Sequence, residues 1–331
     1  MAAANLMTRA VTSTRIASLD VARGAALLAM AVYHFTWDLE FFGYAEPGLT
    51  AAGGWKYFAR AIASSFLGLA GVSLFLAHAR GVRWSAFGRR LAMIVAAAAA
   101  ITLATYFAMP DAFIFFGILH QIALASLLGL FFLRLPWWAT AVAAAAFITA
   151  AFVLRTPLLD HPAWWWTGLS QALPRSNDYV PVFPWFGAVL AGIALAQLAA
   201  RAGALKWLAE RTMPRWTDPL ALAGRHSLAV YLVHQPVLIA SVFLFSQVFP
   251  AQTETPQVQV RLACEDRCRQ DRGEEFCAFY CVCVLDRIEA EGLLGSVLAG
   301  RQDGGTSEKL AGFARVCTAD TERLLRDGED E

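Results

Sequence analysis

Cysteine is absent from the first 250 residues of this 331-residue chain, and charged side chains are scarce throughout it. Asp, Glu, Lys and Arg make up only 16% of the sequence, whereas hydrophobic residues make up 58% and the mean hydropathy is +0.49. A soluble domain of this length does not need so large an apolar fraction to build its core. The composition therefore excludes an ordinary soluble protein and indicates a membrane protein.

Several signatures of soluble enzymes and of nucleic-acid-binding proteins are also missing. The sequence has no Walker-type phosphate loop and no glycine-rich dinucleotide fingerprint after a strand. Its loop arginines alternate with apolar segments instead of forming one basic face, so we expect no nucleic-acid partner. No small-residue cleavage site follows the first apolar run, and we expect that run to remain in the mature protein.

What the chain does contain is a series of apolar segments long enough to cross about 30 Å of hydrocarbon. They lie near residues 19–36, 58–78, 91–109, 113–133, 137–154, 182–200 and 227–249. The sequence therefore predicts an all-α, polytopic membrane bundle of about seven transmembrane helices, with the lipid bilayer as its surroundings.

The loops between these segments differ in basic charge. The loops on one predicted side carry twelve Lys and Arg, against three on the other side. Cytoplasmic loops are enriched in Lys and Arg, so this bias predicts a cytoplasmic N-terminus. With seven crossings, the C-terminus is then extracytoplasmic.

A change in composition near Pro250 predicts two parts. Residues 1–250 carry 17 Lys and Arg against 9 Asp and Glu, whereas residues 251–331 carry 10 against 17 and all six cysteines. We expect a transmembrane domain over 1–250 and a small cysteine-rich helical tail over 251–331.

The tail cysteines are spaced for a helical hairpin. Two Cys-x3-Cys pairs place each pair on one helix face, with a turn predicted near 271–273. An antiparallel hairpin then favours the bridges 264–281 and 268–277, with 283–317 as the third, among the fifteen connectivities that six cysteines allow. Disulfides fit an extracytoplasmic tail. A zinc site is the alternative, but the tail contains no histidine, and we expect no bound metal.

The first apolar segment carries ionisable groups that an ordinary membrane anchor lacks. Arg23 and His34 are eleven positions apart, which returns an α-helix to within roughly 20° of the same azimuth. Asp20 precedes Arg23 by one turn, and Asp38 follows His34 by one turn. The spacing predicts an Arg/Asp pair at one membrane boundary and a His/Asp pair near the other.

Further polar residues lie in the later apolar segments. His120 is within the fourth segment, and the pair His234 and Gln235 precedes Pro236 in the seventh. Intramembrane placement favours a functional cavity for His120, while structural hydrogen bonding is equally consistent with His234. Arg225 and His226 stand at the cytoplasmic start of the last segment, where an interfacial anchor is the alternative to phosphate binding.

Four motifs in order resemble the bacterial form of the heparan-alpha-glucosaminide N-acetyltransferase catalytic-domain family, within the transmembrane acyltransferase superfamily. They are the LD, RG and H-F-x-x-D-L elements of the first segment, FGILHQIALASLL at 116–128, VPVFPWFGAVLAGIAL at 180–195 and GRHSLAVYLVHQPVL at 224–238. The resemblance covers about residues 15–245 and implies acyl transfer from cytoplasmic acetyl-CoA to an amine or hydroxyl, usually on a sugar, across a bacterial inner membrane. It implies that His34 is the catalytic histidine and that Arg23 matches the motif arginine.

The residue chemistry agrees with that implication. A histidine with a pKa near the working pH suits deprotonation of the acceptor, so His34 is expected to act as a general base or as a transient acyl carrier. We expect Asp38 to orient it and His120 to complete the catalytic group. Binding of acyl-CoA is assigned to the following residues: Arg23, Arg225, His226, His234 and Gln235. The aromatic outer loop 155–181 suits either a sugar-containing acceptor or an interfacial belt.

Two other functional classes stay open. In a proton-coupled transporter of small solutes, the intramembrane histidines form a relay, although no internal repeat is visible in the sequence. In a noncatalytic scaffold, His34 is dispensable and the tail binds a partner. The sequence also leaves a homo-oligomer open.

Overall fold

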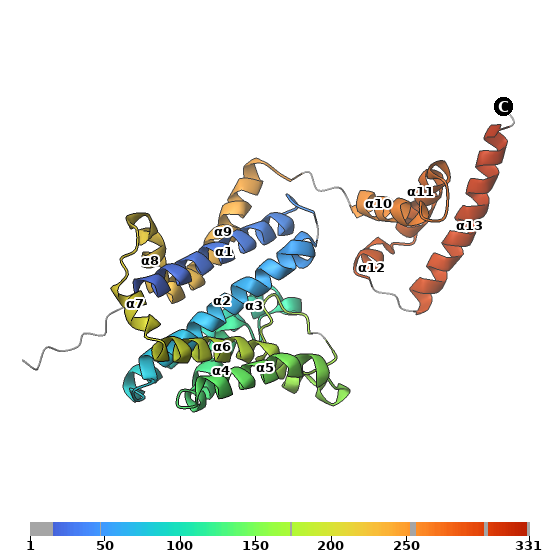
Figure 1. Ribbon diagram of the computed structural model, residues 1–331. Helices are drawn as coiled ribbons and strands as arrows, with labels where there is room; N and C mark the ends of the chain where they lie inside the picture. The colour runs from blue at the N-terminus through green and yellow to red at the C-terminus, as the bar shows by residue number, and fades with distance from the viewer. Residues whose placement is uncertain (1–15, 47, 173, 252–255, 301–303, 330–331) are drawn as a thin grey trace, which may run out of the picture. The chain divides into compact units, whose positions relative to one another are not determined.

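The computed structural model describes residues 16–46, 48–172, 174–251, 256–300 and 304–329. These residues form helices joined mostly by short loops, with a longer connection between Val153 and Val182. The chain divides into two compact units, residues 1–250 and 251–331 (Figure 1). Among the described residues, β-type pairing is limited to an isolated bridge between Thr156 and Ser170. The predicted all-α class is therefore confirmed.

The first unit contains nine α-helices within its described residues. They are α1 (Ala17–Phe41), α2 (Gly53–His78), α3 (Trp84–Ala108), α4 (Ile118–Gly129), α5 (Trp137–Val153), α6 (Val182–Arg201), α7 (Ala204–Glu210), α8 (Asp218–Arg225) and α9 (Ser227–Val248). Short 3-10 turns lie between them, at Leu49–Ala51, Pro110–Ala112, Leu130–Phe132, Pro157–Leu159, Pro162–Thr167 and Arg215–Thr217. Each of the seven apolar segments coincides with one of these helices.

The core of this unit lies where α6 packs against α2 and α5 (Figure 1). Phe186, Leu190 and Ile193 of α6 are almost completely buried, as is Leu67 of α2. The two helices approach closely because Gly192 lies against the backbone of Gly68, where a Cβ atom would collide with the carbonyl oxygen. Small residues at such contacts are the usual means of helix association in a membrane.

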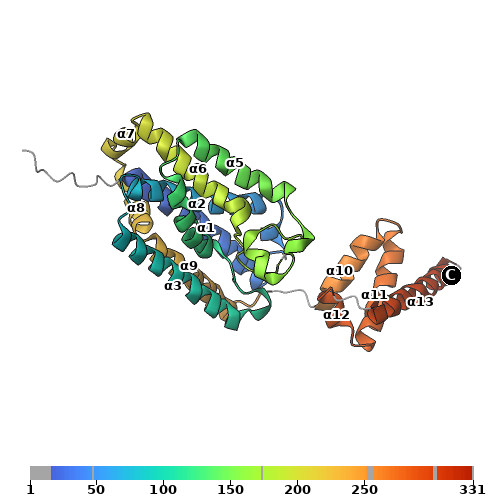
Figure 2. The same ribbon diagram turned by 90° about the horizontal axis from the view of Figure 1, so that it is seen from below.

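A second close contact brings α1 against α8. Gly24 of α1 lies directly on the carbonyl oxygen of Leu220, and Gly224 of α8 lies on the carbonyl oxygen of Asp20. The two glycines are reciprocal, since each one receives the backbone of the other helix. This contact positions α9, which follows α8 directly and packs along α1 and beside α3 (Figure 2).

Four described helices are long and apolar enough to cross a membrane, namely α2, α3, α6 and α9. The Ile118–Phe132 and Trp137–Val153 helices are shorter than the roughly 30 Å of a bilayer core. The predicted segment at 113–133 starts as a helix only at Ile118, because the extended backbone of Gly117 forms its N-cap. Helix α1 is long enough but carries Asp20, Arg23, Asp38 and Glu40.

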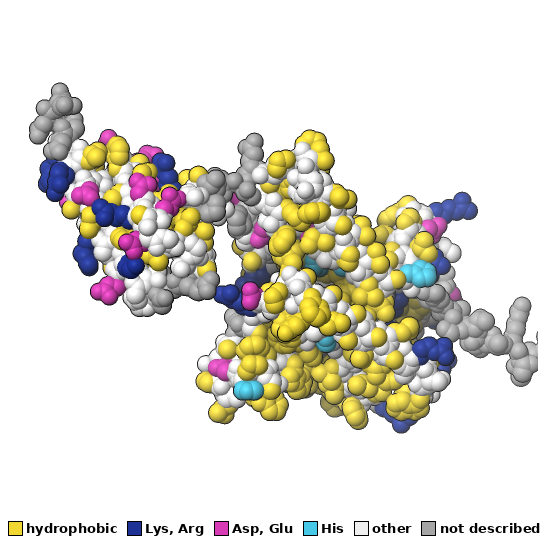
Figure 3. Space-filling view, turned by 180° about the vertical axis from the view of Figure 1, so that it is seen from behind, with side chains coloured by type: hydrophobic (Ala, Val, Ile, Leu, Met, Phe, Trp, Pro, Cys, Tyr) yellow, Lys and Arg dark blue, Asp and Glu magenta, His cyan; other side chains and the backbone are white. Residues whose placement is uncertain are grey.

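The surface of the first unit is mainly hydrophobic on the face shown in Figure 3. Large apolar side chains point outward from its helices, including Phe107 at 76% exposed and Phe152 at 80% exposed. A water-soluble protein rarely exposes so much contiguous apolar surface, whereas a lipid-facing surface requires it. The lipid bilayer is therefore the environment that this surface fits.

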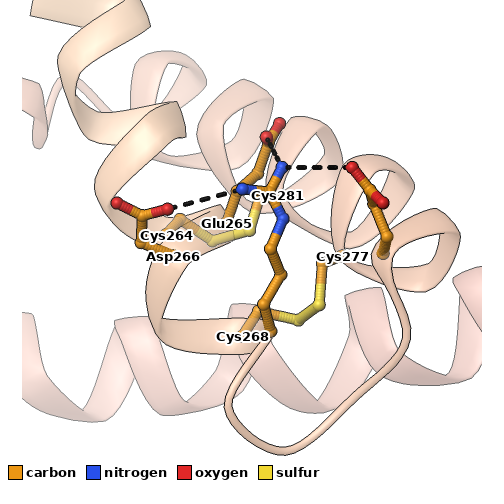
Figure 4. Close-up of a disulfide and its surroundings, with 8 residues drawn as sticks. Cys264, Glu265, Asp266, Cys268, Cys277 and Cys281 are labelled. Carbon is orange, nitrogen blue, oxygen red and sulfur yellow. Dashed lines mark hydrogen bonds and ion pairs between the residues drawn. A yellow bond between two sulfur atoms is a disulfide. The ribbon is translucent and has the colours of Figure 1, made fainter.

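The second unit consists of α10 (Pro256–Cys268), α11 (Glu274–Ala290), α12 (Leu294–Leu298) and α13 (Gly304–Glu329). Cys264 is bonded to Cys281 and Cys268 to Cys277, which joins α10 and α11 as an antiparallel hairpin (Figure 4). A third bond joins Cys283 of α11 to Cys317 of α13. The favoured connectivity is confirmed, and a zinc site on these cysteines is wrong because every thiol is used in a disulfide.

An ionic cluster supports the hairpin in Figure 4. Arg269 lies 3.1 Å from the Glu265 carboxylate and 3.4 Å from the Asp266 carboxylate. Glu265 is buried and also accepts from Arg261 at 2.8 Å, so its charge is compensated from two sides. Arg269 also lies 3.8 Å from the carboxylate of Glu274, the first residue of α11, and this pair links the two helices beside the covalent bonds.

Candidate functional site

The strongest polar cluster of the first unit lies between α1 and α9. The imidazole rings of His34 and His234 have centroids 5.0 Å apart and meet edge to face. One turn along α1, Asp38 is fully buried and accepts a 2.7 Å hydrogen bond from the amide nitrogen of Gln235. Two neighbouring residues of α9 thus contact two residues of α1 that are one helical turn apart.

Three buried polar atoms of this cluster have no hydrogen-bond partner among the described residues. They are Oδ2 of Asp38, Nε2 of His234 and Oε1 of Gln235. Unpaired buried polar atoms are rare in proteins, since each costs about 1–3 kcal/mol in lost hydration. All three can accept a hydrogen bond, so the arrangement is suited to a ligand that brings N–H or O–H donors.

The proton on His234 can be placed from its surroundings. Its Nδ1 lies 2.6 Å from the carbonyl oxygen of Tyr231, one turn earlier in α9. A carbonyl only accepts, so Nδ1 carries the proton and Nε2 of the neutral ring carries the lone pair. His234 therefore presents an acceptor nitrogen beside His34, which is the state that a general base requires.

The His/Asp pair expected within α1 has a different form in the structure. The one described hydrogen bond of Asp38 comes from Gln235, and its second oxygen is unpaired, so no hydrogen bond joins it to His34. Gln235 of α9 is thus the hydrogen-bond partner of Asp38, a role that the sequence analysis gave to His34. A sequence spacing of four places side chains on one face but does not exclude a better partner from another helix.

Arg23 belongs to a separate group at the other end of α1. Its guanidinium lies 2.9 Å from the Asp20 carboxylate, as the sequence predicts, and donates a 2.6 Å hydrogen bond to the buried hydroxyl of Ser73 in α2. Arg23 thus contacts α2 while His34 contacts α9. These contacts place the two side chains in separate surroundings.

Arg225 and His226, at the junction of α8 and α9, are exposed. The Arg225 side chain donates to the carbonyl of Ala221 in its own helix at 3.3 Å. Both side chains are therefore accessible to a ligand. Among the described residues, no residue of another helix forms a hydrogen bond or an ion pair with Arg225.

His120 has both ring nitrogens engaged, one by Gly117 at the start of α4 and the other by Thr102 of α3. Its Nδ1 accepts from the backbone N–H of Gly117 at 3.2 Å, and its Nε2 lies 3.2 Å from the Thr102 hydroxyl. That hydroxyl donates to the Ile114 carbonyl, so it accepts from Nε2. In this geometry His120 caps a helix and has no free lone pair for proton abstraction.

Next to His120, the Asp178 carboxylate accepts from the backbone N–H of Ile118 at 2.8 Å. Asp178 lies in the loop before α6, and burial raises its pKa to about 6 against the opposing effect of that hydrogen bond. It lines a small pocket together with His120 and Tyr231. The sequence analysis placed Asp178 in the outer loop but gave it no contact with α4.

The outer loop over 155–181 is held by Asp160. Its Oδ1 accepts from the backbone N–H groups of Gln171 and Ala172 and from the Ser170 hydroxyl, and these bonds lower its pKa. Trp164 and Trp166 remain exposed, at 47% and 38%, whereas the Trp165 indole donates to the Asp160 carbonyl. Two aromatic faces are thus open to either an acceptor or lipid.

The sequence analysis missed His78 and Arg90, which line a second pocket of the first unit together with Ser126 of α4. The one signal available was the position of Arg90 directly before the predicted apolar segment 91–109. In the described residues, no group of three or more His, Cys, Asp or Glu is arranged to hold a metal ion.

Comparison with known proteins gives one match. Residues 15–236 match the family described as heparan-alpha-glucosaminide N-acetyltransferase, catalytic, and the matched range contains every candidate residue on α1, α4, α8 and α9. No curated protein and no solved structure matches the chain. The match covers more than half of the sequence and ends before the disulfide-bonded unit. The chain therefore belongs to the heparan-alpha-glucosaminide N-acetyltransferase catalytic-domain family, whose members are acetyltransferase-type membrane enzymes.

Proposed function

We propose that this protein transfers an acetyl or related acyl group from cytoplasmic acyl-CoA to an amine or hydroxyl of an extracytoplasmic, sugar-containing acceptor. The observation that carries the proposal is the group of His34, Asp38, His234 and Gln235 between α1 and α9, with its three buried and unpaired acceptor atoms. Membership in an acetyltransferase family supports it. Acetyl-CoA is the expected donor.

The reaction requires a base in an otherwise apolar surrounding. The acceptor N–H or O–H gives its proton to an imidazole nitrogen while the acceptor atom bonds to the acyl carbon. The thioester C–S bond then breaks, and the CoA thiolate leaves with the proton from the imidazolium. His34 serves either as this base or as an acyl carrier that receives the group first. The unpaired oxygens of Asp38 and Gln235 are suited to holding the N–H or O–H donors of the acceptor.

The proposed setting is a bacterial inner membrane, with the N-terminus in the cytoplasm. The uneven distribution of Lys and Arg over the loops supports this orientation. Three disulfides in residues 251–331 support a periplasmic tail, because that compartment is oxidising. Within this setting, residues 1–250 constitute the acyltransferase domain.

The test supplies radiolabelled acetyl-CoA to the cytoplasmic face of inverted membrane vesicles that contain an acceptor extract. Wild type is compared with His34→Ala and Asp38→Asn at matched expression, and His161→Ala serves as the control because His161 lies in the outer loop. We expect label on protein or glycan that His34→Ala abolishes and His161→Ala retains. Absence of transfer above empty vesicles would contradict the proposal, and proton-coupled solute uptake in the same vesicles would favour a transporter.

A further inference from the structure

The pocket lined by His78 and Arg90 lies between α2, α3 and α4, and neither His34 nor His234 lines it. Its apolar walls come from Leu74, Phe87 and Ile94, and its polar atoms from His78, Arg90 and Ser126. The enclosed space is about 20 Å³, which is enough for one water molecule. A larger group must therefore bind at the mouth, where Arg90 is exposed.

His78 is an unusual residue in this wall. It is only 7% exposed, its ring meets Phe87 edge to face at 5.4 Å, and its Nδ1 has no hydrogen-bond partner among the described residues. A buried imidazole nitrogen normally has a partner from the protein. Nδ1 of His78 is therefore a polar atom prepared for a ligand.

The charges around this pocket are mainly positive. Arg90 interacts electrostatically with Arg23, and His78 interacts with both Arg83 and Arg90. Asp20 compensates Arg23, but no ion pair to Arg83 or Arg90 is present among the described residues. Like charges gathered without a counterion repel one another, so an anion is the ligand that this group fits.

We propose that the mouth of this pocket binds a phosphate group through Arg90 and His78, with Arg23 and Ser73 beside it. A guanidinium matches phosphate oxygens with two parallel N–H donors, and the neutral His78 ring with its proton on Nδ1 supplies a third donor from the wall. The arginine-rich segment 79–90, which runs into the first turns of α3, lies on the side proposed as cytoplasmic. A phosphate from the nucleotide end of acyl-CoA is one source, which rests on the proposed function, and an anionic lipid headgroup is the other.

The experiment measures binding to the full chain in phosphatidylcholine nanodiscs by calorimetry, using 3′,5′-ADP as the phosphate probe and adenosine as its phosphate-free control. Arg90→Gln is the test variant, and Arg89→Gln is the matched control, because Arg89 is also exposed but does not line the pocket. We expect Arg90→Gln to weaken 3′,5′-ADP binding about tenfold or more. Arg89→Gln should change it less than about twofold, and adenosine should not bind.

A second arm measures retention of phosphatidylglycerol on the same variants by native mass spectrometry. If wild type does not bind 3′,5′-ADP but retains phosphatidylglycerol, and Arg90→Gln loses this lipid, the phosphate belongs to a lipid headgroup. Equal behaviour of Arg89→Gln and Arg90→Gln toward both probes would overturn the proposal. The thermal unfolding midpoints of Arg89→Gln and Arg90→Gln are also compared. Equal midpoints show that a loss of binding in Arg90→Gln is not caused by unfolding. Neither arm requires acyl transfer, so failure of the pocket and failure of the proposed function are distinguished.

Discussion

Gln235 of α9 donates a 2.7 Å hydrogen bond to the buried carboxylate of Asp38 in α1, across 197 positions of the sequence. The Asp38 carboxylate is fully buried, and among the described residues it accepts a hydrogen bond from Gln235 alone. This bond therefore joins the two helices one helical turn from the histidine pair, and its removal should affect stability.

Replacement of Gln235 by leucine should destabilise the membrane unit. The Asp38 carboxylate would stay buried without its donor, at a cost of about 1–3 kcal/mol. We expect a lower thermal unfolding midpoint in detergent. Val233→Ala is the control, because Val233 lies in the same helix and is 56% exposed. If Gln235→Leu and Val233→Ala unfolded at the same temperature, this role of the bond would be refuted.

Replacement of His234 by asparagine should lower acyl transfer without unfolding the protein. Asparagine keeps a donor near the position of Nδ1, which serves the Tyr231 carbonyl, but removes Nε2. If Nε2 accepts a proton, His234→Asn should lose activity by about 10²–10⁴-fold while its unfolding midpoint is retained. Added imidazole should restore part of the rate, and a fully active His234→Asn would exclude this role.

The glycine contact between α1 and α8 predicts a sharp difference between two Gly→Ala substitutions. A Cβ on Gly24 would collide with the backbone carbonyl of Leu220, which has no rotamer to change. We expect Gly24→Ala to destabilise by about 1–3 kcal/mol. Gly88→Ala, in the open part of α3, should be neutral or stabilising by up to about 1 kcal/mol. Chemical unfolding in mixed micelles measures both, and equal shifts would contradict the packing.

The Asp178 carboxyl should make stability depend on pH. Burial raises its folded pKa to about 6, so the folded state binds a proton more tightly than the unfolded chain. This contribution is fully present below about pH 4 and is lost as the pH rises through about 6, at most about 3 kcal/mol. Asp178→Asn keeps an acceptor for Ile118 and removes the titration. The difference between the midpoints of wild type and Asp178→Asn should change over this pH range, and a constant difference would disprove it.

The third disulfide should hold α13 against α11. Cys283 and Cys317 are 34 positions apart, so their bond restricts the unfolded tail by about 3–4 kcal/mol in the loop-entropy model. The paired Cys283→Ser and Cys317→Ser variant should show faster amide exchange throughout α13. Glu322→Gln, which removes an exposed pair with Arg272, should change exchange little. Protection that persists in the paired variant would show that packing alone holds the helix.

Much of the architecture follows from local pattern. Apolar runs of sufficient length predict the helices, and two Cys-x3-Cys pairs on facing helices favour one disulfide arrangement, which is the one observed. The Asp20–Arg23 pair is likewise within one helical turn. These features depend on residues close in sequence or on a short hairpin, where the helical period determines which side chains share a face.

The candidate site depends on contacts between distant segments. Spacing within α1 favours His34 with Asp38, but the helix packing pairs them with His234 and Gln235. His120, placed by its sequence position in a functional cavity, caps α4 through contacts with Gly117 and Thr102.

By itself, the sequence determined the helices, the boundary between the two parts and the chemistry available on each helix face. Only the tertiary structure decided which faces meet, as the approach of Gly24 to Leu220 shows for α1 and α8. Helix periodicity is a local property that can be calculated along the chain. The rotation and register of one helix against another depend on close contacts between residues nearly two hundred positions apart, and no local pattern contains them.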